Sequence, residues 1–185
     1  GLVVPDTQTD GAPTIYVLDT ISPDETTVVR EAHTFQSGDA LQDEIIWWLQ
    51  ENWGAVRQKR RDSFGNALQG KWDVPLRYLG DWHKQPGFMI KPSMGDLMTA
   101  LDWIDDTENQ MDFLLVPIVT LGHPRTTTTE NAGNVNYTTI PMGNGTEIRV
   151  DFWFIHRQVR MFQPMSVTVW NDDQVPGLMR YPWHL

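Results

Sequence analysis

Apolar residues occur along the chain in short runs and stripes that predict strands separated by two helices. Runs rich in β-branched and aromatic residues predict strands at 2–4, 14–18, 26–35, 74–82, 111–121, 148–156 and 166–170. In the run 148–156 the alternation places Ile148, Val150, Phe152 and Phe154 on one face, and Arg149, Asp151 and Trp153 on the other. Asn144 followed by Gly145 predicts a hairpin turn just before this run.

The helical stripes predict one helix in the first half of the chain and a second after Ser93. Ser37 or Asp39 is expected to cap the first helix, which should end near Trp53–Gly54. Its apolar stripe is Leu41, Ile45, Trp48 and Leu49. The polar segment 58–71, with three consecutive bases at 59–61, is expected to be a solvated loop or, alternatively, a partner-contact loop. No regular structure is predicted for 125–139.

Together these elements predict an α/β (α+β) fold, with a mixed β-sheet flanked by helices. At 185 residues the chain is expected to form a single domain, long enough to bury a core without disulfide bonds or structural metal ions. It contains no cysteine, which excludes disulfides, thiolate zinc sites and cysteine nucleophiles. The net charge of -10 opposes binding to a phosphate backbone, so we expect no nucleic-acid partner. No membrane-spanning or signal segment is visible, and we expect a cytoplasmic protein without membrane association.

The candidate chemistry lies between a strand end and the second helix, in the segment 80–97. His83 and Gln85 are two residues apart on an extended chain and should therefore point the same way. Asp96 follows at the start of the helix. A histidine, a second ligand two residues on and a carboxylate can provide three protein ligands for a divalent ion, leaving a fourth position for water.

A purely structural interpretation of the same residues stays open. Ser93-x-x-Asp96 ahead of an apolar helix is a capping box, with Asp96 favourable at the positive end of the helix. On this view His83 is a hydrogen-bonded structural histidine. An unrelated α/β domain with a fortuitous capping box would show no cluster of His83, Gln85 and Asp96 at a sheet end.

The segment resembles the signature of the JAMM/MPN metalloprotease family (JAB, Mov34), in its prokaryotic type. That signature is an upstream glutamate, then His-x-His-Pro, six residues and Ser-x-x-Asp. Here it reads His83-x-Gln85-Pro86, six residues, Ser93-x-x-Asp96. The opening Gly1-Leu2-Val3-Val4 resembles the glycine-led strand that follows the family's glutamate. The resemblance covers about 1–122, with the strands of 148–170 completing an MPN-like sheet.

The resemblance implies a zinc enzyme that cleaves an isopeptide or peptide bond after a ubiquitin-like tail. It assigns His83 and Asp96 as Zn²⁺ ligands and Ser93 as the residue that helps stabilise the oxyanion. The implied partners are a ubiquitin-like protein or peptide substrate, together with activating and conjugating enzymes of the same system.

Two departures from the signature predict weak catalysis or none. Gln85 occupies the second zinc-ligand position, and an amide oxygen is a poorer zinc ligand than imidazole. The upstream glutamate, the family's general base, has no counterpart, because Gly1 already matches the strand after it. Glu25 and Glu31 are the nearest acids, but both lie well after that strand.

The two departures have three alternative explanations. In the first, the chain is cut at its N-terminus, with Gln85 either natural or an engineered inactivating change. In the second, it is a natural inactive member, an MPN scaffold that docks a partner through a sheet edge or a Trp-rich surface. Alternatively, a further histidine completes the site; the candidates are His33, His123, His156 and His184.

Overall fold

A computed structural model of the chain describes residues 1–6, 11–22, 29–30, 35–36, 40–64, 73–123 and 135–169. Backbone contacts divide the chain into two compact units, one made of Gly1–Tyr78 with Asn171–Leu185 and the other of Leu79–Trp170. The mixture of helices with two-stranded and five-stranded sheets confirms the predicted α/β class, while the single domain over 1–185 stays a prediction.

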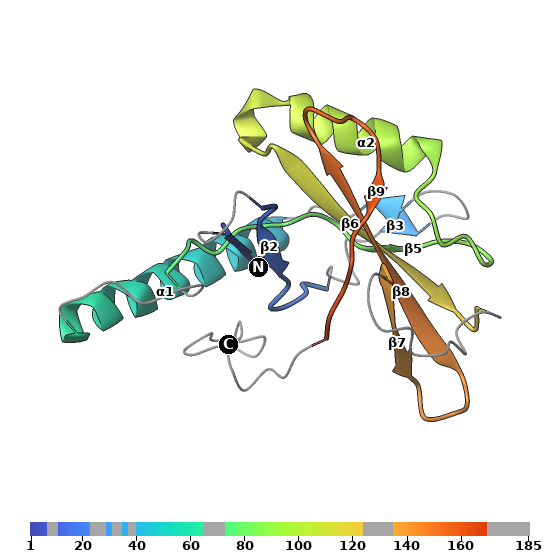
Figure 1. Ribbon diagram of the computed structural model, residues 1–185, viewed down its shortest axis with the longest axis horizontal. Helices are drawn as coiled ribbons and strands as arrows, with labels where there is room; N and C mark the ends of the chain where they lie inside the picture. The colour runs from blue at the N-terminus through green and yellow to red at the C-terminus, as the bar shows by residue number, and fades with distance from the viewer. Residues whose placement is uncertain are drawn as a thin grey trace. The chain divides into compact units, whose positions relative to one another are not determined.

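The first unit contains two short antiparallel strand pairs and one long helix (Figure 1). Strand β1 (Leu2–Val4) pairs with β2 (Thr14–Tyr16), which confirms the first two predicted strands. Strand β3 (Val29–Arg30) pairs with β4 (Phe35–Gln36) in the region expected to be extended. Helix α1 (Ala40–Phe64) follows, and its expected caps at residues 37 and 39 lie outside the described residues.

Helix α1 does not end near Trp53–Gly54 as predicted but continues to Phe64. The reason lies in contacts distant in sequence. The Trp53 indole is 2% exposed and its Nε1 donates to the Val74 carbonyl at 2.9 Å. One turn later, Arg57 donates to the carboxylate and backbone carbonyl of Asp73. The basic run 59–61 is therefore helical rather than part of a loop, and 65–72 lies outside the described residues.

The second unit is built around a mixed sheet whose strand order is β5-β6-β8-β7 (Figure 1). Its strands are β5 (His83–Lys84), β6 (Phe113–Leu121), β7 (Tyr137–Pro141), β8 (Glu147–His156) and β9 (Gln163–Pro164). Among the described strands of this sheet, only the pair β5–β6 is parallel; the other pairs are antiparallel. Strands β7 and β8 form the hairpin predicted at Gly145, with Met142 N–H donating to the Thr146 carbonyl.

Helix α2 (Met94–Asp105), followed by the 3₁₀ turn η2 (Thr107–Asn109), packs on one face of this sheet. The core combines Ala100 and Ile104 of α2 with alternate residues of β6 and with Ile155 of β8; the β6 members are Leu114, Val116 and Ile118. The even-numbered positions of β6 therefore form the buried face. This face continues across β8 through Arg149 and Asp151, which are 5% and 1% exposed.

Three predicted segments differ from the structure. Residues 137–139, expected to lack regular structure, begin β7, while 125–134 lie outside the described residues. The last strand, expected at 166–170, is absent over 166–169; instead Gln163 and Pro164 pair with Phe154 and Trp153. The strand expected at 74–82 is reduced to isolated hydrogen bonds, and regular pairing begins only at His83.

Gly80 explains why the strand 74–82 is interrupted. Its φ of 145° is a conformation that residues with a side chain rarely adopt, and it lets the backbone approach Leu115 closely. A Cβ at position 80 would meet the Leu115 carbonyl oxygen at 2.0 Å. The close approach fixes the chain just before the candidate site, since Leu115 N–H donates to the Leu79 carbonyl at 2.8 Å.

Gly80→Ala is accordingly expected to lower the free energy of unfolding of the second unit by about 3 kcal/mol, from backbone strain and overpacking combined. Urea unfolding measures the change. The control is Gly54→Ala in helix α1, where a Cβ meets nothing within 4 Å and should stabilise the helix slightly. Equal stability of Gly80→Ala and the native chain would contradict the packing described.

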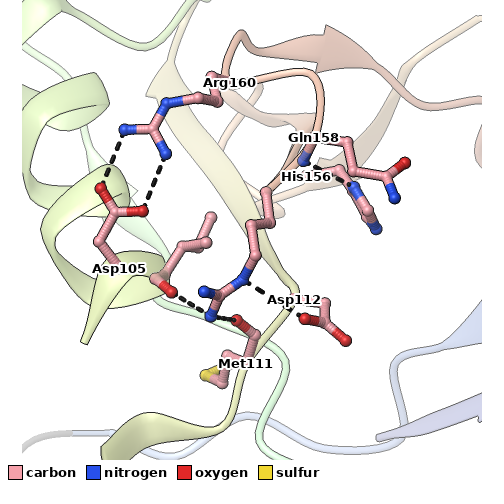
Figure 2. A network of polar contacts seen from close by, with 8 residues as sticks. Asp105, Met111, Asp112, His156, Gln158 and Arg160 are labelled. Atoms are coloured by element: carbon pink, nitrogen blue, oxygen red, sulfur yellow. Dashed lines mark hydrogen bonds and ion pairs between the residues drawn. The ribbon is translucent and has the colours of Figure 1, made fainter. Parts of the chain in front are cut away.

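Arginines after β8 attach the far end of α2 to the sheet (Figure 2). Arg157 donates through Nη2 to the carbonyls of Ile104 and Met111, and its backbone N–H bonds the Asp112 carbonyl at 2.7 Å. Arg160 forms a two-pronged ion pair with Asp105, at 2.8 and 2.9 Å. The Ile104 carbonyl in the last turn of α2 thus receives a cationic donor, the arrangement favoured at a helix C-terminus.

The hydrogen bonds from Arg160 lower the pKa of Asp105 below its ordinary value. A depressed carboxyl pKa stabilises the fold above the unfolded pKa, and this stabilisation is lost as the pH falls through the folded pKa. Arg160→Gln should return the Asp105 pKa towards its ordinary value, as measured by NMR titration. It should also narrow the difference between stability at neutral pH and at pH 3. An unchanged Asp105 titration would show that the pair does not persist in solution.

Within the described ranges, neither helix combines the length and apolar character needed to cross a membrane.

Candidate functional site

Strand β5 and the residue after it carry the first two candidate side chains. His83 pairs with Ile118 and Lys84 with Val119, and the N–H of Gln85 continues the ladder by donating to the Val119 carbonyl at 3.2 Å. Because side chains alternate along an extended chain, His83 and Gln85 share the buried face, while Lys84 points the other way and is exposed. The predicted common direction of His83 and Gln85 is confirmed by their contact.

The start of α2 supplies the carboxylate. Ser93 is the N-cap, and its Oγ accepts from the backbone N–H of Asp96 at 3.2 Å, while the Asp96 Oδ2 accepts from the Ser93 N–H. This reciprocal capping box fixes the Asp96 side chain at the positive end of the helix. The predicted capping box is therefore present, and it aims Asp96 at the end of β5.

His83, Gln85 and Asp96 meet at this point, and we call them the His83–Gln85–Asp96 cluster. Gln85 Nε2 donates to Asp96 Oδ2 at 2.8 Å and lies 3.1 Å from His83 Nε2. His83 Nε2 lies 3.2 Å from Asp96 Oδ1. The side chains of His83 and Asp96 are each 22% exposed, whereas Gln85 is 6% exposed. The hypothesis of a fortuitous capping box predicted that these three side chains would not cluster at a sheet end, and their contacts contradict that prediction.

Two proton arrangements satisfy the cluster. In one, His83 carries its proton on Nε2 and donates to Asp96 Oδ1. In the other, His83 Nε2 accepts from the second amide hydrogen of Gln85. The contacts are therefore compatible with either tautomer of the imidazole.

The geometry of His83 and Asp96 fits a tetrahedral cation site. Ligand bonds of roughly 2.1 Å place two ligands of one zinc ion roughly 3.4 Å apart, close to the 3.2 Å between His83 Nε2 and Asp96 Oδ1. Gln85 faces the same point with its amide nitrogen, which cannot ligate. A half-turn of the amide would exchange this nitrogen for Oε1, a possible though weaker ligand. His83 and Asp96 thus fit a site for a divalent ion, in which Gln85 would be a poor third ligand.

Ser93, predicted to assist an oxyanion, lies beside this cluster. Its Oγ already accepts the Asp96 N–H, and the hydroxyl hydrogen remains as a donor. The loop between Gln85 and Ser93 is held to the sheet by Trp153, whose Nε1 donates to the Ile90 carbonyl at 2.9 Å. The cluster therefore sits in a framework fixed by strand pairing, a capping box and an indole hydrogen bond.

The alternative ligands do not complete the cluster within the described part of the chain. There, no three His, Asp or Glu side chains come close enough together to hold a metal, so neither His123 nor His156 joins His83 and Asp96 as a third such ligand. His123 is buried, with its ring edge-on to Phe88 at 5.6 Å. The remaining candidates lie outside the described residues; they are Glu25, Glu31, His33 and His184.

Sequence reasoning missed a second polar group on the same face of the sheet. Arg149 donates to both oxygens of Asp151, at 2.8 and 2.7 Å, and its guanidinium lies 3.8 Å from the centre of the Tyr137 ring. Next to Arg149 on β6 is Thr120, which is fully buried. The spacing Arg149-x-Asp151 on an alternating strand was the available signal, because residues two apart share a face.

In comparisons with known proteins, no family model, curated protein or solved structure matches this chain.

Proposed function

We propose that the chain is a JAMM/MPN-type zinc metallopeptidase or isopeptidase domain of the prokaryotic type, with impaired activity and an MPN-like sheet. Its substrate is a ubiquitin-like protein or a peptide tail. The observation that carries the proposal is the convergence of His83, Gln85 and Asp96 at the end of β5, with the capping residue Ser93 beside them. These contacts support the proposal.

In this proposal each residue has a defined task. His83 Nε2 and Asp96 Oδ1 hold Zn²⁺, with Gln85 Oε1 as a weak third ligand. Zinc, when bound, supplies a water of lowered pKa and polarises a carbonyl oxygen. The Ser93 hydroxyl donates towards the developing oxyanion. Because an amide oxygen is a weak zinc ligand, Gln85 is expected to lower zinc occupancy and with it the rate of turnover.

The proposed partners follow from the same function. A ubiquitin-like system in the cytoplasm would bring the substrate together with its activating and conjugating enzymes. The charge of -10 favours a basic protein surface over nucleic acid or an anionic membrane.

Zinc stoichiometry tests the proposal. We expect the native chain to bind zinc stoichiometrically when the metal is in excess. Asp96→Ala and Gln85→Ala should each abolish this binding. Asp102→Ala, which changes an exposed aspartate on the same helix, serves as the matched control and should bind like the native chain. A chain that binds no zinc, and whose stability zinc does not change, would contradict the enzymatic proposal.

One observation favours a second candidate, a catalytically inactive MPN scaffold that binds a protein partner. Gln85 Nε2 lies within hydrogen-bonding distance of both His83 and Asp96, so the three side chains satisfy one another without a cation. A scaffold would bind its ubiquitin-like partner equally well with a chelator present and after Asp96→Ala. Loss of that binding under either condition would contradict the scaffold.

A further inference from the structure

Strand β7 lies at one edge of the five-stranded sheet, last in the order β5-β6-β8-β7, with β8 on its inner side (Figure 1). Hydrogen bonds just beyond its two ends show which residues point inward. The Phe152 N–H donates to the Asn136 carbonyl, and the Met142 N–H donates to the Thr146 carbonyl. Since hydrogen-bonded pairs alternate along an antiparallel ladder, the even-numbered residues of β7 bond to β8 and the odd-numbered residues face outward.

The outward N–H and C=O groups of Tyr137 and Thr139 have no backbone partner in the part of the chain that the structure describes. On one side of them, the Val135 carbonyl already accepts the Val167 N–H at 3.1 Å; on the other, Pro141 has no N–H to donate. We call the stretch between, Tyr137–Thr139, the β7 edge. Proteins commonly protect such edges with charged side chains, but none of the five residues of β7 is charged.

The two faces of the sheet beside the β7 edge differ in chemistry. On the face opposite α2, Ile140 is 49% exposed and shares a row with Ile148 and Leu121. On the other face, Glu147 pairs with Pro141. No hydrogen bond or ion pair joins the Glu147 carboxylate to another described residue, although its Oε2 is buried. A buried carboxylate oxygen without a donor favours a cationic partner.

A basic side chain on a strand added at the β7 edge could reach Glu147. A residue added opposite Pro141 would lie about 5.5 Å from it, and Glu147 lies about 4.5 Å on its other side, so the two backbones would be roughly 10 Å apart. Extended lysine and glutamate side chains together span that separation. The net charge of -10 also favours a basic partner.

We propose that the β7 edge binds an extended segment of a partner protein in which lysine or arginine alternates with apolar residues. The segment adds a strand to the sheet, and its backbone bonds to Tyr137 and Thr139. One basic side chain pairs with Glu147, while apolar side chains on the other face pack beside Ile140. Because β7 and β5 are at opposite edges of the sheet, this inference goes beyond the proposed zinc enzyme and does not depend on it.

Amide hydrogen exchange followed by NMR tests the edge directly, with a short synthetic peptide of alternating lysine and valine as the probe. Saturating peptide should slow exchange of the Tyr137 and Thr139 amide protons by at least about 10-fold, because they become hydrogen-bonded. The Thr138 and Ile140 amides are already directed at β8 and serve as internal controls that should change less. Peptide binding without added protection at Tyr137 and Thr139 would overturn the inference.

Variants separate backbone pairing from charge, with fluorescence anisotropy of the labelled peptide as the measurement. Thr139→Pro removes one outward N–H, as Pro141 does two residues later, and should weaken binding about 10-fold. Thr139→Val keeps the N–H and should bind like the native chain. Glu147→Gln should also weaken binding about 10-fold, and should abolish the preference for this peptide over one with glutamine in place of lysine. Asp102→Asn, at an exposed acid on α2, should change nothing.

Each contrary outcome has a distinct meaning. Equal binding to Thr139→Pro and Thr139→Val would overturn strand addition. If Thr139→Pro fails to fold, hydrogen exchange in the native chain and Glu147→Gln decide instead. Equal losses from Glu147→Gln and Asp102→Asn would overturn the pairing with Glu147. Edge amides protected in the chain alone would also overturn the proposal: protection lost on dilution would identify a second copy as the occupant, and protection at every concentration would identify the chain itself.

The zinc site is tested separately. Glu147→Gln and Thr139→Pro should bind zinc as the native chain does, so failure of the proposed function and failure of this inference appear in different measurements.

Discussion

Replacing Gln85 by histidine is expected to raise the zinc affinity of the chain by more than 100-fold. Loss of an outer partner of a metal ligand already costs about 10–100-fold in affinity, and exchanging an amide oxygen for imidazole changes a ligand itself. The ring would replace a buried amide whose Nε2 lies 3.1 Å from His83 Nε2 and 2.8 Å from Asp96 Oδ2. Competition titrations against a chelator of known affinity measure the gain.

The matched control for this prediction is Lys84→His. It introduces the same ring one residue away, but the side chain at position 84 points to the opposite face of the strand and is exposed. Zinc affinity should therefore stay at the native level. An equal gain from both substitutions would show that added imidazole, rather than the cluster, binds the metal.

Asp151→Ala is expected to cost about 3–5 kcal/mol in the free energy of unfolding, the largest loss of stability we predict. The carboxylate is 1% exposed and accepts both bonds from Arg149, which is itself 5% exposed. Removing it leaves a buried guanidinium without its counter-ion. Urea unfolding followed by tryptophan fluorescence measures the loss.

Replacing both partners of the buried pair separates the cost of an unpaired charge from the value of the pair. Arg149→Met with Asp151→Leu should recover most of the stability, since apolar side chains of similar size often replace buried ion pairs without loss. Asp105→Ala breaks an exposed pair with Arg160 and should change stability little. If Asp151→Ala were as mild as Asp105→Ala, the buried pair would not exist in solution.

The candidate site was predictable because its determinants are local. Alternation along an extended chain sets His83 and Gln85 on one face, and the Ser93–Asp96 capping box fixes the direction of the carboxylate. The parallel pairing of β5 with β6 is the one determinant of the site that the local sequence does not indicate. The resemblance to the JAMM/MPN signature depends on the same residues and stays a prediction.

The parts that were not predictable depend on contacts between distant segments. Helix α1 continues past Gly54, where Trp53 and Arg57 bond to residues 21 and 16 positions later. The interruption at Gly80 follows from the approach to Leu115, which a single sequence does not reveal. The position of Thr120 beside Gln85 likewise follows only from the pairing of β5 with β6 in register.

In the proposed enzyme His83, position 85 and Asp96 form one cation site at the end of β5. Anomalous diffraction at the zinc absorption edge, from crystals of the Gln85→His chain grown with one equivalent of zinc, tests this most directly. We expect one strong peak bonded to His83 Nε2, to an Asp96 carboxylate oxygen and to the substituted side chain. A peak at other residues, or no peak between His83 and Asp96, would contradict it.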